Sequence, residues 1–139
     1  ARNFNQGFAT VEFTASALVD MKLYELSNPP QDMEKFEAEV LGEINMPEEI
    51  VMRHRLPHFM HIVSGYAAGY YSYMWSEVMD ADAFAAFEET GDIFDRKTAN
   101  RLKRYVYSAG NMRDPQEAYV KFRGRAPEVV GLLKNRGFA

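Results

Sequence analysis

The chain has 139 residues, a length that suits one domain and leaves little room for two. Sixteen Lys and Arg against 20 Asp and Glu give a net charge of -4, which argues against nucleic-acid binding because that needs a basic excess. The chain has no Cys, which excludes disulfides, thiolate metal sites and Cys nucleophiles. No secretory signal and no apolar run long enough for a membrane span is visible. We expect a cytoplasmic protein that binds neither nucleic acid nor membrane.

The first part of the chain carries clear helix signals. Apolar residues at helical spacing follow Thr10, a predicted N-cap, and indicate a helix that ends near Leu26, before a Pro-Pro pair. Asp32 is predicted to cap a second helix, whose apolar stripe runs to Ile44. Pro47 and the two Glu residues after it are typical of a short helical start.

The second part of the chain predicts five more helices. Their approximate bounds are 66–79, 80–90, 96–109, 115–123 and 127–135. Asp95 and Asp114 are the predicted N-caps of the third and fourth of these helices. No alternating pattern typical of strands competes with this one. The sequence therefore predicts an all-α fold of about seven helices, in a single helical domain that covers residues 1–139.

Three histidines lie in the segment 53–65, which is predicted to be irregular. They are His54, His58 and His61, and imidazole is a common zinc ligand. The first two have the four-residue separation of a zinc-binding HExxH helix, but an arginine replaces its Glu and a proline between them would break the helix. A three-histidine metal site is therefore disfavoured. Polar loop histidines, or a substrate-site role for one of them, are the other interpretations.

The segment 61–77 is the most distinctive part of the sequence. On a helix, Tyr66, Tyr70 and Tyr73 fall on one face, and Glu77 lies one turn beyond. A buried phenol needs a hydrogen-bond partner, so three phenols on one face suit a cleft wall that binds a polar ligand. The alternative is an amphipathic helix whose tyrosines face water or neighbouring loops. The spacing alone leaves both interpretations open.

The stretch that begins at Gly65 reads Gly-Tyr-x-Ala-x-Tyr-Tyr-x-Tyr, which is a specific pattern. With several other stretches of the chain, it resembles the C-terminal part of the thimet-oligopeptidase family of zinc peptidases, which includes oligopeptidase A and bacterial peptidyl-dipeptidase. The matching segments are 4–8, 17–21, 61–78, 94–95, 108–111 and 122–127. Their order and spacing hold over nearly the whole chain. In residues 4–8 and the helix after them, the chain looks most like bacterial peptidyl-dipeptidase.

The resemblance implies a largely helical metallopeptidase that hydrolyses short peptides. Members of this family bind zinc through an HExxH helix and a Glu on a following helix, and this sequence contains no HExxH. The resemblance therefore implies that the chain is a C-terminal fragment of a larger enzyme. We expect the fragment to be inactive alone, to bind no metal itself, and to depend on zinc held by residues of the missing upstream half.

The resemblance also assigns roles to the histidine and tyrosine segment. In the family, the residues that match His61, Tyr66 and Tyr73 reach the scissile carbonyl, whose oxygen gains negative charge during hydrolysis. Tyr73 is the expected main oxyanion donor, and His61 is the second expected catalytic residue. Tyr66 and Tyr70 are expected to bind substrate.

The alternative function is a non-catalytic helical module that binds peptides.

The chain is rich in large apolar residues, with 10 Phe, 8 Tyr, 1 Trp and 8 Met. These residues suggest more apolar surface than an isolated helical domain needs. Large exposed apolar patches tend to find partners. We therefore expect the isolated chain to self-associate.

Overall fold

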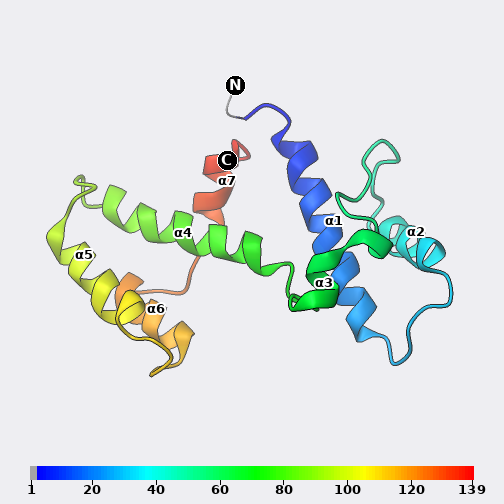
Figure 1. The fold of residues 1–139 in the computed structure, drawn as a ribbon. Coiled ribbons are helices and arrows are strands. Elements are labelled where there is room, and N and C mark those ends of the chain that lie inside the picture. The colour runs from blue at the N-terminus through cyan, green and yellow to red at the C-terminus, as the bar shows by residue number, and fades with distance from the viewer. Residues whose placement is uncertain (1–2) are drawn as a thin grey trace. The chain divides into compact units, whose positions relative to one another are not determined.

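A computed structural model describes residues 3–139 of the chain (Figure 1). Within these residues the structure holds seven α-helices and no β-strand, which confirms the all-α prediction. The helices are α1 (Gln6–Glu25), α2 (Met33–Glu43), α3 (Met60–Ser64), α4 (Ser72–Glu88), α5 (Arg96–Leu102), α6 (Pro115–Arg123) and α7 (Val130–Arg136). Two short segments complete them, a 3-10 helix η1 (Leu56–His58) and a π-helix η2 (Lys103–Tyr107) that continues α5. No helix described between residues 3 and 139 is long and apolar enough to cross a membrane.

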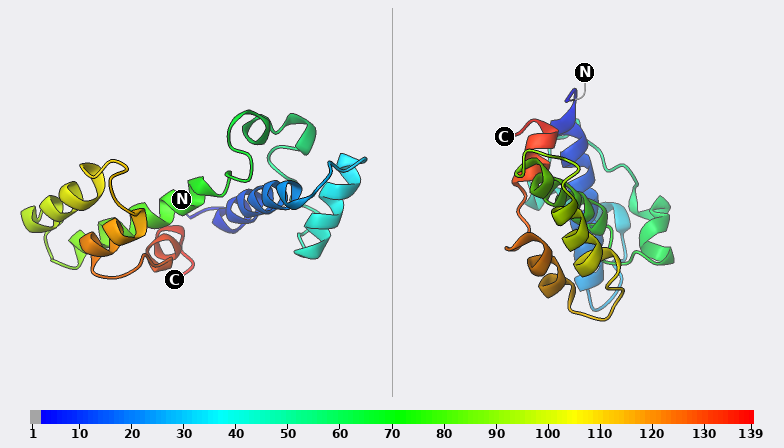
Figure 2. Two further views of the ribbon diagram at one scale, coloured as in Figure 1. Left: turned by 90° about the horizontal axis from the view of Figure 1, so that it is seen from below. Right: turned by 90° about the vertical axis from the view of Figure 1, so that its left-hand side faces the viewer.

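The chain divides into two compact units, and the boundary along the sequence falls between Tyr73 and Met74. Figure 2 gives two further views of the helices in each unit. Each unit is described by itself below. The prediction of a single domain over residues 1–139 stays a prediction.

Three helix starts follow the predicted capping residues. The carboxylates of Asp32, Asp95 and Asp114 each accept a hydrogen bond from the backbone N–H three residues further on, at 3.0, 2.7 and 2.9 Å. These bonds satisfy N–H groups that the first helical turn leaves without a partner. At its other end α6 stops at Gly124, whose φ of 85° is the left-handed conformation that glycine adopts at low cost. The predicted bounds of α2 and α6 are confirmed to within a residue.

Three other predicted starts are wrong. α1 begins at Gln6, not after Thr10. The first turn is largely exposed, so its sequence lacks the apolar periodicity that would indicate a helix there. The segment after Pro47 is a turn closed by one backbone hydrogen bond of 3.0 Å, since no apolar stripe follows to bury a helix there. α7 begins at Val130, three residues after Pro127.

The largest difference lies between residues 53 and 88. The segment predicted to be irregular contains η1 and α3, and the predicted helix over 66–79 is instead a series of turns over 65–71 followed by α4. α4 runs without a break to Glu88, so no second helix starts at Asp80 or Asp82. Asp82 is 2% exposed and binds side chains of the C-terminal unit, so it does not act as an N-cap.

The core of the N-terminal unit forms where α1, α2, η1 and α3 meet. Figure 1 shows α1 beside α2 and α3. The buried apolar side chains of this core are Ala17, Val19, Val40, Met52, Leu56, Phe59, Ile62 and Tyr70. Tyr70, predicted as a site residue, is therefore also part of this core.

The C-terminal unit is held by a buried charge network around Asp82. Its carboxylate accepts a hydrogen bond from the Tyr119 hydroxyl at 2.6 Å and forms ion pairs with Arg125 at 2.7 Å and Arg123 at 3.4 Å. Burial, and then the bond to Asp82, raise the pKa of Tyr119 far above its usual value. These contacts join α4 to α6 beside the buried ring of Phe122.

Candidate substrate site

The four residues predicted to form the site lie together in the N-terminal unit. The ring of His61 has its centroid 6.2, 5.3 and 6.0 Å from those of Tyr66, Tyr70 and Tyr73. The Tyr66 and Tyr73 rings stack at 5.4 Å, with their planes inclined by 18°. The Tyr70 and Tyr73 centroids are 5.5 Å apart, with the rings in edge contact. We call these four residues the aromatic cluster.

The three tyrosines were predicted to share one helix face, and this prediction is wrong. His61 lies on α3, Tyr66 and Tyr70 lie in the turns over 65–71, and Tyr73 lies in the first turn of α4. The turns are closed by backbone N–H groups that bind carbonyls three residues back, at 2.9 Å from Gly69 to Tyr66 and 3.0 Å in the following turn. The turns and the start of α4 thus bring together the tyrosines that were predicted to share one helix face.

Glu77 binds a side chain of the C-terminal unit. Its carboxylate accepts a hydrogen bond of 2.5 Å from the Arg136 guanidinium of α7. This ion pair lies within the C-terminal unit. Glu77 does lie one turn beyond Tyr73 on α4, as predicted, but Tyr66 and Tyr70 are not helical, so the common helix face predicted for these residues does not exist.

The members of the cluster differ in exposure. Tyr66 is 45% and Tyr73 40% exposed, whereas Tyr70 is 5% exposed. The Tyr70 ring stacks on Phe13 of α1 at 4.8 Å and meets Phe59 edge-on at the same distance. Tyr70 thus anchors the cluster to the core, while Tyr66 and Tyr73 present their rings to solvent.

The pKa values of the Tyr70 and Tyr73 phenols are raised. A hydrogen bond with the side chain of Tyr66 is the main cause that raises the pKa of Tyr73 above its usual value of 10.0. Burial is the main cause that raises the pKa of Tyr70. A phenol with the usual pKa of 10.0 is already protonated at neutral pH, so the raised pKa values extend to higher pH the range over which both hydroxyls can donate a hydrogen bond.

The three histidines do not gather into a metal site. His54 and His61 have centroids 5.6 Å apart, and His54 stacks on Phe59 at 5.3 Å. His58 ends η1 and is exposed. Across residues 3–139, no three His, Asp or Glu side chains are grouped so that they could hold a metal ion. The residues present therefore do not fit a zinc ion.

One residue that supports the cluster was not identified as functional from the sequence. Asp20, on α1, is fully buried, and its two carboxylate oxygens accept hydrogen bonds from the backbone N–H groups of Ala68 at 2.9 Å and Tyr70 at 3.0 Å. A buried charge needs such partners. The available signal was an acidic residue directly after Val19 in the buried stripe of α1, but the sequence does not show which groups it binds.

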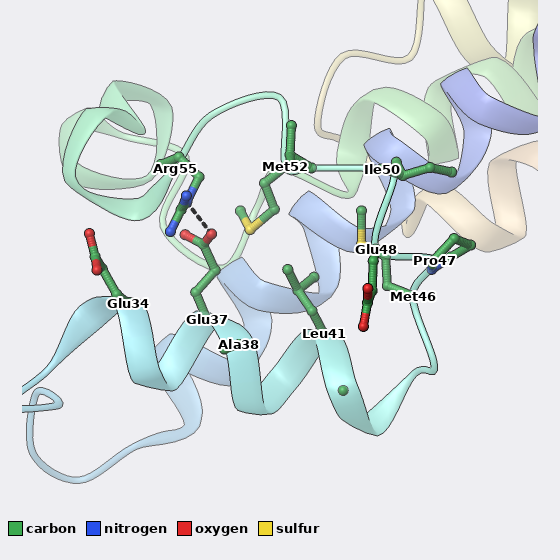
Figure 3. A pocket seen from close by; sticks show the side chains of 12 residues that line it. Glu34, Glu37, Ala38, Leu41, Met46, Pro47, Glu48, Ile50, Met52 and Arg55 are labelled. Carbon is green, nitrogen blue, oxygen red and sulfur yellow. Dashed lines mark ion pairs between the residues drawn. The ribbon is translucent and has the colours of Figure 1, made fainter.

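A separate pocket of about 490 Å³ lies between α2 and the segment 46–55 (Figure 3). Its buried carboxylate is Glu37, which forms an ion pair with Arg55 and accepts the backbone N–H of Leu56 at 3.1 Å. Glu37 thus fixes the start of η1. The pocket does not include any member of the aromatic cluster.

Comparison with known proteins shows which family the chain belongs to. The sequence profile of Peptidase family M3 matches residues 1–138. The chain is 36% identical over 138 residues to dipeptidyl carboxypeptidase of Escherichia coli, covering 96% of this chain and 20% of that protein. It is 36% identical over 142 residues to oligopeptidase A of E. coli, covering 99% and 20%. An organellar oligopeptidase A of Arabidopsis thaliana is 35% identical over 143 residues, covering 99% and 18%. The chain spans about one fifth of the length of these relatives, and it belongs to Peptidase family M3.

Proposed function

We propose that the chain forms the C-terminal part of a zinc peptidase that hydrolyses short peptides, and that the aromatic cluster contacts the substrate. One observation carries this proposal: the rings of three tyrosines, separated along the chain by turns, each have their centroid within 6.2 Å of that of the His61 imidazole. The names of the relatives, oligopeptidase A and dipeptidyl carboxypeptidase, supply the substrate class.

Tyr73 is the main oxyanion donor in this proposal. Hydrolysis of a peptide bond builds negative charge on the carbonyl oxygen, and a neutral O–H donor placed there stabilises the transition state. Tyr73 is 40% exposed, and its raised pKa keeps the proton on the phenol up to a higher pH than usual. In the free chain its hydroxyl is engaged with Tyr66, so a bound carbonyl oxygen would replace one phenol partner by another acceptor.

The other cluster members support binding. In the proposal His61 offers an imidazole N–H to the same carbonyl, and the 6.0 Å between its ring centroid and that of Tyr73 supports this role. Tyr66 contacts the substrate through its exposed ring. Tyr70 contributes the buried floor on which the other rings rest.

The proposal assigns the zinc ion to residues outside this chain. The described side chains contain no group that fits the metal, and the family implies one in its whole enzymes. The chain alone is therefore proposed to be inactive and to need the upstream half of the enzyme as its partner. We also propose a cytoplasmic location, although one of the relatives is named as organellar, and self-association of the isolated chain through exposed apolar side chains such as Phe94, which is 81% exposed.

A non-catalytic peptide-binding module is the second candidate. The exposure of Tyr66 and Tyr73 favours it, because exposed aromatic rings can bind a peptide without catalysing its cleavage.

An exchange of segments separates the two candidates. This chain replaces the matched 142-residue segment in E. coli oligopeptidase A, and the grafted enzyme is tested for zinc-dependent cleavage of short peptides. Circular dichroism and zinc content report whether the graft is folded. Cleavage by the graft, and none by the chain alone, supports the peptidase. A folded, zinc-loaded graft that binds peptides without cleaving them supports the binding module and overturns the peptidase.

A further inference from the structure

We propose that Asp20 is a positioning residue that holds the turns over 65–71, and through them the aromatic cluster, in the geometry that acts on substrate. This inference rests on the proposed function. It concerns a residue of α1 that lies 46 positions before Tyr66 in the chain. Asp20 does not contact the substrate in this proposal. It acts through the backbone that carries the tyrosines.

The geometry assigns both carboxylate oxygens of Asp20 to this segment. Oδ1 accepts the N–H of Ala68 at 2.9 Å, and Oδ2 accepts the N–H of Tyr70 at 3.0 Å. The side chain is 0% exposed, so water cannot replace either bond. Hydrogen bonds from backbone amides to a charged acceptor are stronger than bonds between neutral groups. The two bonds therefore fix the backbone on both sides of Gly69.

The backbone at Ala68 is in a conformation that needs such support. Its φ is 51°, a left-handed conformation that a residue with a Cβ adopts only at a cost. Strained residues persist when the surrounding structure over-determines them, and they concentrate at functional sites. The N–H of this residue is the one that Asp20 binds at 2.9 Å.

Two other side chains on the same stripe of α1 contact the same part of the chain. Phe13 stacks on Tyr70, and the Tyr24 hydroxyl donates a hydrogen bond of 2.5 Å to the carbonyl of Ile62. Positions 13, 20 and 24 are separated by seven and four residues, which places them on one helix face. One face of α1 thus contacts residues 62–70, and Asp20 lies between the other two contacting residues on that face.

The variant Asp20→Asn tests the role with little change of shape. An amide side chain has one acceptor oxygen, and its NH2 group faces an N–H donor, so one of the two bonds is lost. The matched control is Glu37→Gln. Glu37 is 4% exposed and also accepts a backbone N–H, but that N–H belongs to Leu56 and not to the turns.

Hydrogen exchange in the grafted oligopeptidase A, read by mass spectrometry on peptides that cover 66–71 and 54–58, gives the first result. Asp20→Asn is expected to speed exchange in 66–71 by about tenfold or more and leave 54–58 unchanged, because local opening is set by local contacts. Glu37→Gln is expected to give the reverse. Unchanged exchange in 66–71, or an equal rise in both segments, overturns the proposal. This readout does not require activity, so it stands apart from failure of the proposed function.

Kinetics in the same graft give the second result. Asp20→Asn is expected to lower kcat by about tenfold with little change in KM, since a misplaced catalytic group costs transition-state contacts most. Adding Ala68→Gly is expected to restore part of kcat in the Asp20→Asn variant only, because glycine adopts φ of 51° without strain. A loss of kcat that Ala68→Gly does not rescue would indicate a general stability effect and contradict the positioning role. If Asp20→Asn does not fold, Asp20→Glu is measured in the same assays and judged by the same outcomes.

Discussion

The Tyr73 ring stacks on the Tyr66 ring, with centroids 5.4 Å apart and planes inclined by 18°. The hydrogen bond between the two side chains raises the pKa of Tyr73 above 10.0. The two phenols thus form one hydrogen-bonded unit at the exposed side of the aromatic cluster. Because the contact with Tyr66 raises the pKa of Tyr73, the geometry of this unit affects the pH at which Tyr73 loses its proton.

This unit predicts how activity responds to alkaline pH. Tyr73 must stay protonated to act as a donor, so activity is lost only as the pH rises through its raised pKa. Tyr66→Phe removes the bond that raises this pKa, and the alkaline limb of kcat in the grafted enzyme should move to lower pH. Peptide cleavage across an alkaline pH series measures it. An unmoved limb in Tyr66→Phe would show that Tyr73 does not set it.

A second prediction concerns the histidines. Because no metal-holding group occurs between residues 3 and 139, the chain purified without an affinity tag and exposed to excess zinc should retain about none after desalting. Elemental analysis gives the zinc content per chain, and the grafted oligopeptidase A is the positive control. Retention of about one zinc per chain, lost in His61→Ala, would give His61 a ligand role and contradict its assignment as a donor.

The buried network of the C-terminal unit predicts a large stability effect. Asp82→Asn removes the charge that pairs with Arg123 and Arg125, and breaking a buried ion pair in this way costs about 3–5 kcal/mol. The matched control is Asp80→Asn, an exposed acid on the same helix, for which a change within about 0.5 kcal/mol is expected. Denaturant unfolding measures both. Equal effects of the two substitutions would show that the network does not stabilise the unit.

Two glycines in helices predict opposite effects of the same substitution. A Cβ on Gly131 of α7 would lie 3.1 Å from the backbone carbon of Ala81, so Gly131→Ala should push α7 from α4 and destabilise the chain by about 1–3 kcal/mol. Gly42 of α2 has open space around its Cβ position, so Gly42→Ala should stabilise by about 0.5–1 kcal/mol. Thermal unfolding of both variants gives the signs. A stabilising Gly131→Ala would show that the close approach is not required.

Local sequence signals predicted the parts of the fold that local interactions determine. Asp32 and Asp114 cap the helices they were expected to cap, because an N-cap bond spans only three residues. The turns over 65–71 could not be predicted in this way. Their conformation depends on Asp20, which is 48 residues from Ala68 in the chain. Residue spacing within one helical turn carries no information about so distant a contact.

The proximity of the four predicted residues is observed, although the helix that was predicted to carry the tyrosines is not. Tyr66, Tyr70 and Tyr73 do gather around His61, although only Tyr73 lies on a helix longer than five residues. The family resemblance pointed to these residues, but it did not predict the backbone conformation that carries them. Their roles on a substrate stay predictions.

The kinetic effect of Tyr73→Phe in the grafted oligopeptidase A tests the central proposal most directly. The substitution removes one hydroxyl and keeps the ring that stacks on Tyr66. Loss of an oxyanion donor should lower kcat by about two to three orders of magnitude while KM changes little, because the contact strengthens in the transition state. A kcat close to that of the parent graft, or a rise in KM as large as the fall in kcat, would contradict the assignment.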